Sequence, residues 1–150
     1  MYNRLFRETC DREKPDVMII GMPGGIMLIN SYTHELFGET ALALTNADRP
    51  DVTLMSYYYY IGRVMQDYFE MLQKYACYGL GIKNVYFHSA NTKLIEERDA
   101  KLTDYLALKS DFVLQNQPND IQLFNALILE SYEPVYQNVI ETLQQNICVM

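Results

Sequence analysis

The residues of this sequence that could do chemistry lie in three short segments, and each segment follows an apolar run. The first is the glycine-rich turn Gly21-Met22-Pro23-Gly24-Gly25, where backbone N–H groups could approach an anion or another ligand closely. The other two segments bring serine, tyrosine, histidine and asparagine side chains. The candidate ligand-binding residues are Gly21, Gly24, Gly25, Asn30, His34, Ser56, Tyr57, His88, Ser89 and Asn91.

The glycine turn lacks the signatures of the common nucleotide-binding loops. No Gly-Lys-Ser/Thr sequence ends it, and its spacing differs from Gly-x-Gly-x-x-Gly. No acidic residue follows the second apolar run to hold a ribose. Two interpretations remain. Either the turn is tight because the chain passes a neighbouring loop, or its backbone contacts an anion or another small ligand.

Histidines and serines offer weaker hypotheses. His34 and His88 are the only histidines, and both are expected where a strand leads into a helix, so they could shuttle a proton or share a metal ion. No Asp, Glu or Cys at ligand spacing accompanies them, so the sequence predicts no metal site. Ser31, Ser56 and Ser89 occupy no Gly-x-Ser-x-Gly elbow, which argues against serine hydrolysis. Catalytic residues and any cofactor therefore stay unassigned.

Tyrosine is unusually abundant. The chain has 13 Tyr and 8 Met but no Trp, and such side chains favour contact surfaces as well as cores. The run of four tyrosines at residues 57–60 could line a pocket mouth or stack on a flat ligand. Alternatively, it completes the core and caps the following helix. The composition also makes a homodimer or a docking face a reasonable expectation.

A repeat in the chain indicates the strands that must position these residues. Residues 14–20 (KPDVMII) are echoed 35 residues later by residues 49–55 (RPDVTLM). In each, a proline stops the preceding helix, an aspartate turns the chain, and a continuous apolar run follows. Continuous apolar runs are typical of strands in a parallel sheet that is covered on both faces. Runs at 84–88 and 121–127 predict two further strands.

Helical patterns lie between these strands. Apolar residues recur at helical spacing in 34–46, 61–78 and 132–146, with Pro134 expected in the first turn of the last helix. Gly79 and Gly81 are expected to end the second helix. An irregular insertion at 90–118 is expected to hold a short helix around 96–103 and an edge strand at 105–109.

Together these patterns predict an α/β fold. We expect a three-layer, Rossmann-like sandwich with a mainly parallel sheet of four to five strands and helices on both faces. Residues 1–13 are expected to form a leading helix or linker, and residues 14–150 a single α/β domain. In such sheets ligands bind outside the carboxyl ends of the strands, which is where the candidate residues fall.

Composition excludes several classes of partner. The net charge is −7 and Lys and Arg do not cluster, so nucleic acid is not expected as a partner. The acidity serves either solubility or an acidic recognition surface. No apolar stretch approaches the roughly 20 residues that a membrane span needs, and no secretion signal is recognised, so no membrane association is expected. The three cysteines lie far apart, which fits reduced thiols in a cytoplasmic protein.

Residues 15–27 (PDVMIIGMPGGIM), continued by Asn30, Thr33 and Phe37-Gly38, resemble the clostridial peptide maturation system proteins. The second Pro-Asp strand and the Tyr-rich turn fit the same pattern. The resemblance covers roughly residues 14–145, and its most specific part is the Gly-Met-Pro-Gly-Gly-Ile-Met stretch. Family members often have Pro and Asn soon after Ile-Met, where this chain has Leu28-Ile29-Asn30, so the details of the turn stay open.

The resemblance implies a bacterial context beside bacteriocin-like precursor peptides and their processing enzymes, and it implies that this chain is the C-terminal domain of a longer protein. It implies no reaction, because the family has no assigned catalytic residues. The expected function is an accessory or binding domain in the maturation of a ribosomally made peptide, holding a precursor peptide or a partner protein. The alternative is a nucleotide- or small-ligand-binding enzyme domain that uses the Gly21–Gly25 turn.

Overall fold

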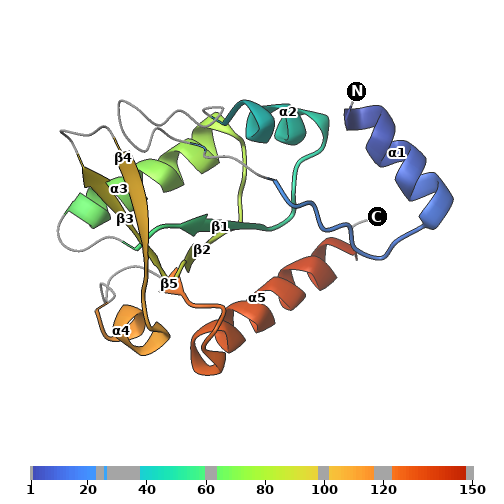
Figure 1. The fold of residues 1–150 in the computed structure, drawn as a ribbon. Coiled ribbons are helices and arrows are strands. Elements are labelled where there is room, and N and C mark those ends of the chain that lie inside the picture. Colours follow the sequence, from blue (N-terminus) through green and yellow to red (C-terminus); the bar gives the residue numbers. More distant parts are fainter. Residues whose placement is uncertain are drawn as a thin grey trace.

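Helices and strands alternate along most of the chain (Figure 1). The computed structural model describes residues 2–22, 26, 38–59, 64–97, 102–116 and 123–147. Its elements are α1 (Tyr2–Glu13), α2 (Glu39–Ala47), β1 (Thr53–Tyr57), α3 (Val64–Lys74), a π-helical turn (Tyr75–Gly79), β2 (Val85–Ser89), β3 (Thr92–Glu97), β4 (Leu102–Ala107), α4 (Ser110–Gln115), β5 (Leu123–Phe124) and α5 (Leu129–Ile147).

Three of the four predicted strands form a parallel sheet. Within the described residues its order is β1-β2-β5, and both neighbouring pairs are parallel. Ser56 lies opposite His88, and His88 lies opposite Phe124. The mixed α/β class and the parallel pairing predicted from the continuous apolar runs are therefore confirmed, with the last strand shorter than predicted.

Helix α3 covers one face of this sheet. Phe69 and Leu72 are three residues apart, so they share one side of the helix, and both are buried against Tyr57 and Phe87. The Phe69 ring meets the Tyr57 ring edge-on at 4.4 Å and the Phe87 ring at 5.1 Å. Each such buried aromatic side chain contributes about 1.5–3 kcal/mol through loss of exposed apolar surface.

The end of α3 and helix α2 pack on the same side of the sheet. Ala41 of α2 joins Leu80 and Ile82 in a second buried cluster, which also contacts Met55 and Val85 of the sheet. The chain leaves the π-helical turn through Gly81, whose φ of 68° is a left-handed conformation that glycine adopts without strain. The predicted end of this helix is confirmed.

Helix α5 runs from the end of β5 to the start of β1. The Ser131 hydroxyl accepts a hydrogen bond from the backbone N–H of Asn125 at 2.9 Å, and Asn146 donates to the Asp51 carboxylate at 2.7 Å. Figure 1 shows the helix crossing beside the strands. The predicted helix is confirmed but begins earlier, at Leu129, so Pro134 lies in its second turn rather than its first.

The first predicted strand is absent. Residues 17–22 form neither strand nor helix, and Ile19 is 92% exposed. A continuous apolar run indicates strand propensity, but a strand also needs a neighbour to accept and donate its backbone hydrogen bonds. Among the described residues, strand β1 pairs with β2 alone, so residues 17–22 pair with no neighbouring strand.

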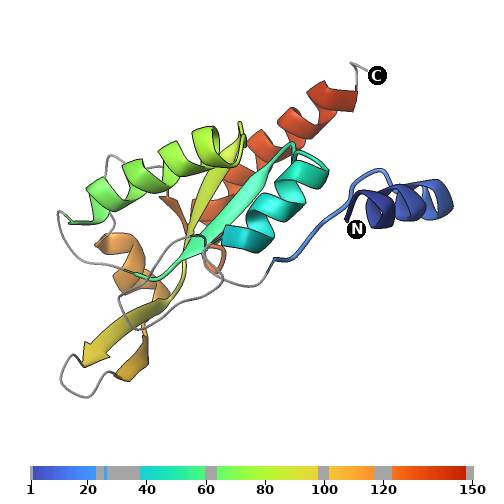
Figure 2. The same cartoon turned by 90° about the horizontal axis from the view of Figure 1, so that it is seen from above.

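The insertion is more regular than predicted. Strands β3 and β4 form an antiparallel two-stranded sheet of their own, so the helix predicted around 96–103 is wrong in its described residues, and α4 follows directly. The predicted edge strand at 105–109 is confirmed in part, because β4 ends at Ala107. Figure 2 shows this hairpin projecting from the rest of the molecule.

Candidate functional site

The carboxyl ends of β1 and β2 bring four predicted site residues together. Ser56 lies directly opposite His88, and Tyr57 lies opposite Ser89. Side chains alternate along a strand, so the first pair faces one side of the sheet and the second pair faces the other. Gly24, Gly25, Asn30 and His34 lie outside the described residues.

Ser56 and His88 interact through their side chains. The Ser56 hydroxyl lies 3.1 Å from Nδ1 of His88, and the His88 ring is tilted against Phe124 with centroids 5.3 Å apart. Burial lowers the pKa of His88, so the ring is neutral near pH 7. With the ring proton on Nε2, the Ser56 hydroxyl donates to Nδ1; with the other tautomer the direction is reversed.

A serine beside a histidine resembles a nucleophile and its general base, but no third partner stands among the described residues. In the part of the chain that the structure describes, no carboxylate hydrogen-bonds to His88. Nucleophilic serines are normally activated by a histidine that a third group orients. The pair is therefore a hydrogen-bonding group at the strand ends rather than a complete catalytic arrangement.

On the opposite face, the Tyr57 and Ser89 side chains are buried without hydrogen bonds. Neither the Tyr57 hydroxyl nor the Ser89 hydroxyl has a partner among the described residues. Burial raises the pKa of Tyr57, and the nearby Ser89 hydroxyl offsets part of that rise although the two groups do not reach hydrogen-bonding geometry. Buried polar groups in proteins are almost always paired, so two unpaired hydroxyls side by side indicate a place that could receive a polar group.

Asn91 is fully engaged in the fold. Its side-chain N–H donates to the Ser110 hydroxyl at 2.6 Å, and its side-chain oxygen accepts from Asn125 at 2.6 Å. The Asn125 oxygen in turn accepts from the backbone N–H of Leu127 at 3.0 Å. These bonds tie the end of β2 to the starts of α4 and α5.

Sequence reasoning missed Ser110 and Asn125. Asn125 is fully buried, and an amide that directly follows Leu123 and Phe124 in an apolar run was a signal for a polar contact. Ser110 carried no comparable signal, because its partner lies 19 residues away.

The tyrosine run connects the sheet to the insertion. Tyr57 and Tyr59 are buried, which supports the interpretation that the run completes the core. The half-buried Tyr58 packs against Tyr105 of β4 at 5.5 Å, and Tyr59 packs against Phe112 of α4 at 5.9 Å. These rings hold the hairpin and α4 against the end of β1.

Gly21 has open surroundings. A Cβ atom added there would meet no atom of the described residues within 4 Å, so none of these residues explains the glycine by close passage. Both interpretations of the turn stay predictions.

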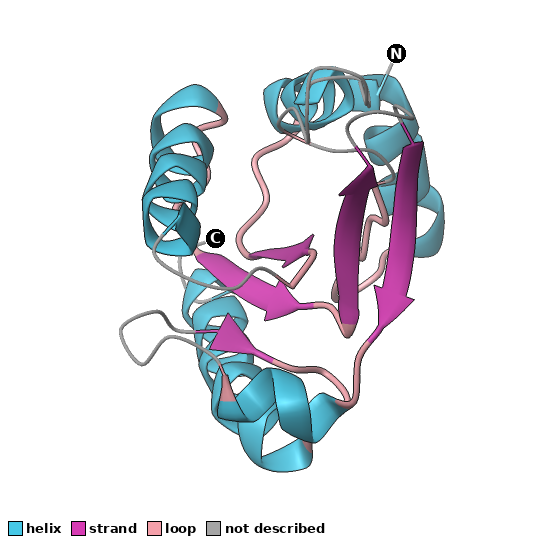
Figure 3. Ribbon diagram, turned by 60° about the vertical axis from the view of Figure 1, so that its left-hand side comes forward, coloured by secondary structure: helices cyan, strands magenta, loops and turns pink. Residues whose placement is uncertain are grey.

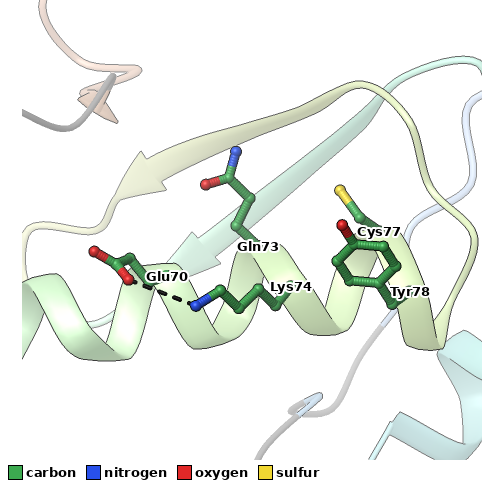
Figure 4. Close-up of a pocket in the computed structure, with 5 residues that line it drawn as sticks. All are labelled: Glu70, Gln73, Lys74, Cys77 and Tyr78. Atoms are coloured by element: carbon green, nitrogen blue, oxygen red, sulfur yellow. Dashed lines mark ion pairs between the residues drawn. The ribbon is translucent and has the colours of Figure 1, made fainter.

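A shallow hollow in the described residues lies elsewhere. It is an open depression on the solvent side of α3, lined by Glu70, Gln73, Lys74, Cys77 and Tyr78 (Figure 4). Lys74 and Glu70 pair across one helical turn at 3.7 Å, and Tyr78 is almost fully exposed. None of the predicted site residues that the structure describes lines it.

The described residues offer neither a metal site nor a membrane span. No three His, Cys, Asp or Glu side chains gather closely enough to hold a metal ion. No described helix combines the length and apolar character that crossing a membrane requires. Comparisons of the chain with protein-family models, with curated proteins and with solved structures find no match.

Proposed function

We propose that this chain is an accessory binding domain in the maturation of a ribosomally made peptide, and that it docks a precursor peptide or partner protein on the β3–β4 hairpin and α4. The observation that carries this proposal is the set of large apolar side chains exposed on this projecting unit, namely Ile95, Tyr105, Leu106, Phe112 and Leu114.

One face of the hairpin exposes apolar side chains. Lys93 pairs with Leu106 and Ile95 pairs with Asp104, so Ile95 and Leu106 are diagonal neighbours on the same face. Their side chains are 43% and 48% exposed. A two-stranded ribbon is only marginally stable alone, and a partner covering this face would stabilise it.

The strand edges add a means of recognition. Among the described residues β3 pairs as a strand only with β4. On the outer edges, the Thr92 carbonyl accepts from the backbone N–H of Tyr59 and the Tyr105 N–H donates to the Asp104 carboxylate, both at 2.8 Å, and no other strand covers these edges in the described chain. An extended peptide can add to such an edge through main-chain hydrogen bonds, while pockets beside it select alternate side chains. The half-exposed Tyr105 is suited to that contact, because tyrosine combines a large apolar ring with a polar tip. Figure 3 shows the long paired strands of the hairpin.

The proposal includes a larger sheet and a cytoplasmic location. The engagement of α2 and α3 on one side of the sheet and the contact of α5 with Asp51 favour a three-layer, Rossmann-like arrangement of four to five strands. The scattered cysteines, of which Cys10 and Cys77 are free and exposed, favour a reducing, cytoplasmic location.

The test is a binding assay between the purified chain and a ribosomally made precursor peptide of the bacteriocin-like class. Fluorescence anisotropy should show binding that Ile95→Ser/Leu106→Ser weakens at least about tenfold, because truncating central contact residues costs more than about 1 kcal/mol each. Leu127→Ser is the matched control, since Leu127 is 73% exposed on another element. Binding of the double variant at wild-type strength, with an unchanged circular dichroism spectrum, contradicts the proposal.

A second copy of the chain is the other occupant that this face could take. Light scattering over a range of concentrations distinguishes the two: a strict monomer excludes the homodimer, and a dimer that Ile95→Ser/Leu106→Ser dissociates establishes it.

The second candidate function is binding of a nucleotide or another small ligand by the Gly21–Gly25 turn and the strand ends, as an enzyme domain. The unpaired Tyr57 and Ser89 hydroxyls favour it, because a ligand's polar group would satisfy both. A thermal-shift panel of nucleotides and cofactors should then give a response that Gly24→Val and Ser89→Ala abolish. A panel without any response argues against this function.

A further inference from the structure

We propose that the unpaired edge of β1 is the docking site for residues 17–20 of the same chain, which add there as a fourth parallel strand. This surface is separate from the hairpin, so the inference goes beyond the proposed binding function. It also has a consequence for the strand-end site, because it carries Gly21 to the side of Ser56.

Strand β1 offers a complete edge. Among the described strands it is the outermost of the parallel sheet, with β2 on its other side. Leu54 lies in the middle of β1, opposite Tyr86 of β2. Its side chain is nevertheless 58% exposed. A flat, apolar edge strand with unpaired backbone groups invites another strand, and natural proteins usually cover or blunt such an edge.

The segment 17–20 matches that edge. Val17, Ile19 and Ile20 are all exposed, and no backbone hydrogen bond joins the segment to any other described residue. Its sequence repeats the Pro-Asp-Val start of the β1 segment 35 residues earlier. The segment is rich in β-branched residues, which favour a strand, and it has no strand partner among the described residues.

Helix α2 provides the crossover that joins residues 17–20 to β1. Helix α2 lies between the segment and β1 in the chain, and Ala41 packs it near Met55 and Val85, on the side of the sheet that α3 covers. Strand–helix–strand crossovers between parallel strands are right-handed in almost all proteins. If α2 and α3 make crossovers of the same hand on the same face, the strand before α2 must lie on the side of β1 opposite β2.

We propose the register in which the two Pro-Asp motifs lie side by side. Aligning the two Pro-Asp motifs places Ile19 opposite Leu54, so the two exposed apolar side chains cover each other. Gly21 then lies opposite Ser56, the partner of His88. Open space around Gly21 leaves this position free to approach the strand end. Docking would thus bring the start of the glycine turn to the carboxyl edge of the sheet.

Hydrogen exchange of the full chain tests the docked strand directly. In this register the amides of Met18 and Ile20 face β1 and the amide of Ile19 faces away from it. We therefore expect the Met18 and Ile20 amides to exchange at least about a hundredfold more slowly than in an unstructured peptide. The amides of β2 give the reference for a paired strand. Exchange of the Met18 and Ile20 amides at the unstructured rate overturns the proposal.

Cross-linking identifies the chain that supplies the strand. In a background of Cys10→Ser, Cys77→Ser and Cys148→Ser, the pair Ile19→Cys/Leu54→Cys should react with a short dithiol-specific cross-linker within one chain. The control pair Ile19→Cys/Leu127→Cys should not, because Leu127 lies beyond β5, at the far side of the sheet. If the two thiols introduced at positions 19 and 54 are linked only between two chains, the strand is exchanged and docking within the same chain is overturned. The absence of any link between them overturns the strand addition itself.

Discussion

Replacing Asn125 with alanine tests whether the polar network at the strand ends holds the parallel sheet to the insertion. The Asn125 side chain is fully buried, donates to Asn91 at 2.6 Å and accepts from the backbone of Leu127 at 3.0 Å. Asn125→Ala removes both bonds and leaves two partner groups, one oxygen and one N–H, without them.

The expected loss follows from these two bonds. Each contributes about 0.5–1.5 kcal/mol net, and a buried partner left unsatisfied costs about 1–3 kcal/mol. Asn91 is partly accessible and Leu127 is exposed, so water satisfies part of that demand. We therefore expect the free energy of unfolding to fall by about 2–3 kcal/mol, from a total of about 5–15 kcal/mol. For a chain of this length the melting temperature should drop by roughly 4–12 °C.

Urea unfolding followed by circular dichroism measures this loss. Asn146→Ala is the matched control, because Asn146 is exposed and makes one bond to Asp51; it should change stability by less than about 0.5 kcal/mol. A double-mutant cycle with Asn91→Ala should give a coupling energy of about 0.5–3 kcal/mol. If Asn125→Ala is as stable as the control variant, the network does not hold these elements together.

Three further variants test the packing and electrostatics of the same region. His88→Phe should flatten the pH dependence of the melting temperature. Burial lowers the folded-state pKa of His88, so the unfolded chain binds a proton first and the wild type loses stability as pH falls below about 6.5. If the melting temperatures of both proteins change with pH in parallel, this reasoning is refuted. Tyr57→Phe should leave the free energy of unfolding unchanged or raise it by up to about 1 kcal/mol, because it removes an unpaired buried hydroxyl, and a clear loss in thermal melts would mean that the hydroxyl has a partner. Phe69→Ala should cost about 3–5 kcal/mol in urea unfolding, well above Phe112→Ala, whose ring is exposed; equal costs would show that α3 does not hold the core.

The sequence predicted the strands of the parallel sheet. The runs that became β1 and β2 are apolar, and α2 and α3 cover one face of them, although Leu54 on the other face of β1 is exposed. Parallel topology places the ends of such strands together. The position of Ser56 and His88 at the same edge of the sheet therefore follows from two strand predictions and one geometric rule, whereas their direct contact is a finding of the structure.

The hairpin could not be predicted in the same way. Its strands TKLIEE and LTDYLA mix apolar and charged residues, and described residues of β4 are exposed on both faces. Alternation of apolar and polar residues identifies a strand only when one face is buried. The network of Asn125 was equally hidden, because its partner Asn91 lies 34 residues away in sequence.

Whether this domain binds a partner or a small ligand depends on which polar and apolar groups are already used. At the strand ends, Ser56 is engaged with His88, and Asn91 is engaged with Ser110 and Asn125. Among the described groups there, only the buried Tyr57 and Ser89 hydroxyls await a partner, and reaching them requires the surrounding side chains to move. On the hairpin, by contrast, apolar side chains are exposed and need no rearrangement to make contact.

Because binding to a preformed surface avoids the free-energy cost of reorganisation, partner binding on the hairpin is favoured over ligand binding at the strand ends. Docking of residues 17–20 on β1 would alter that balance, since it would bring Gly21 and its backbone groups to the strand ends beside Ser56.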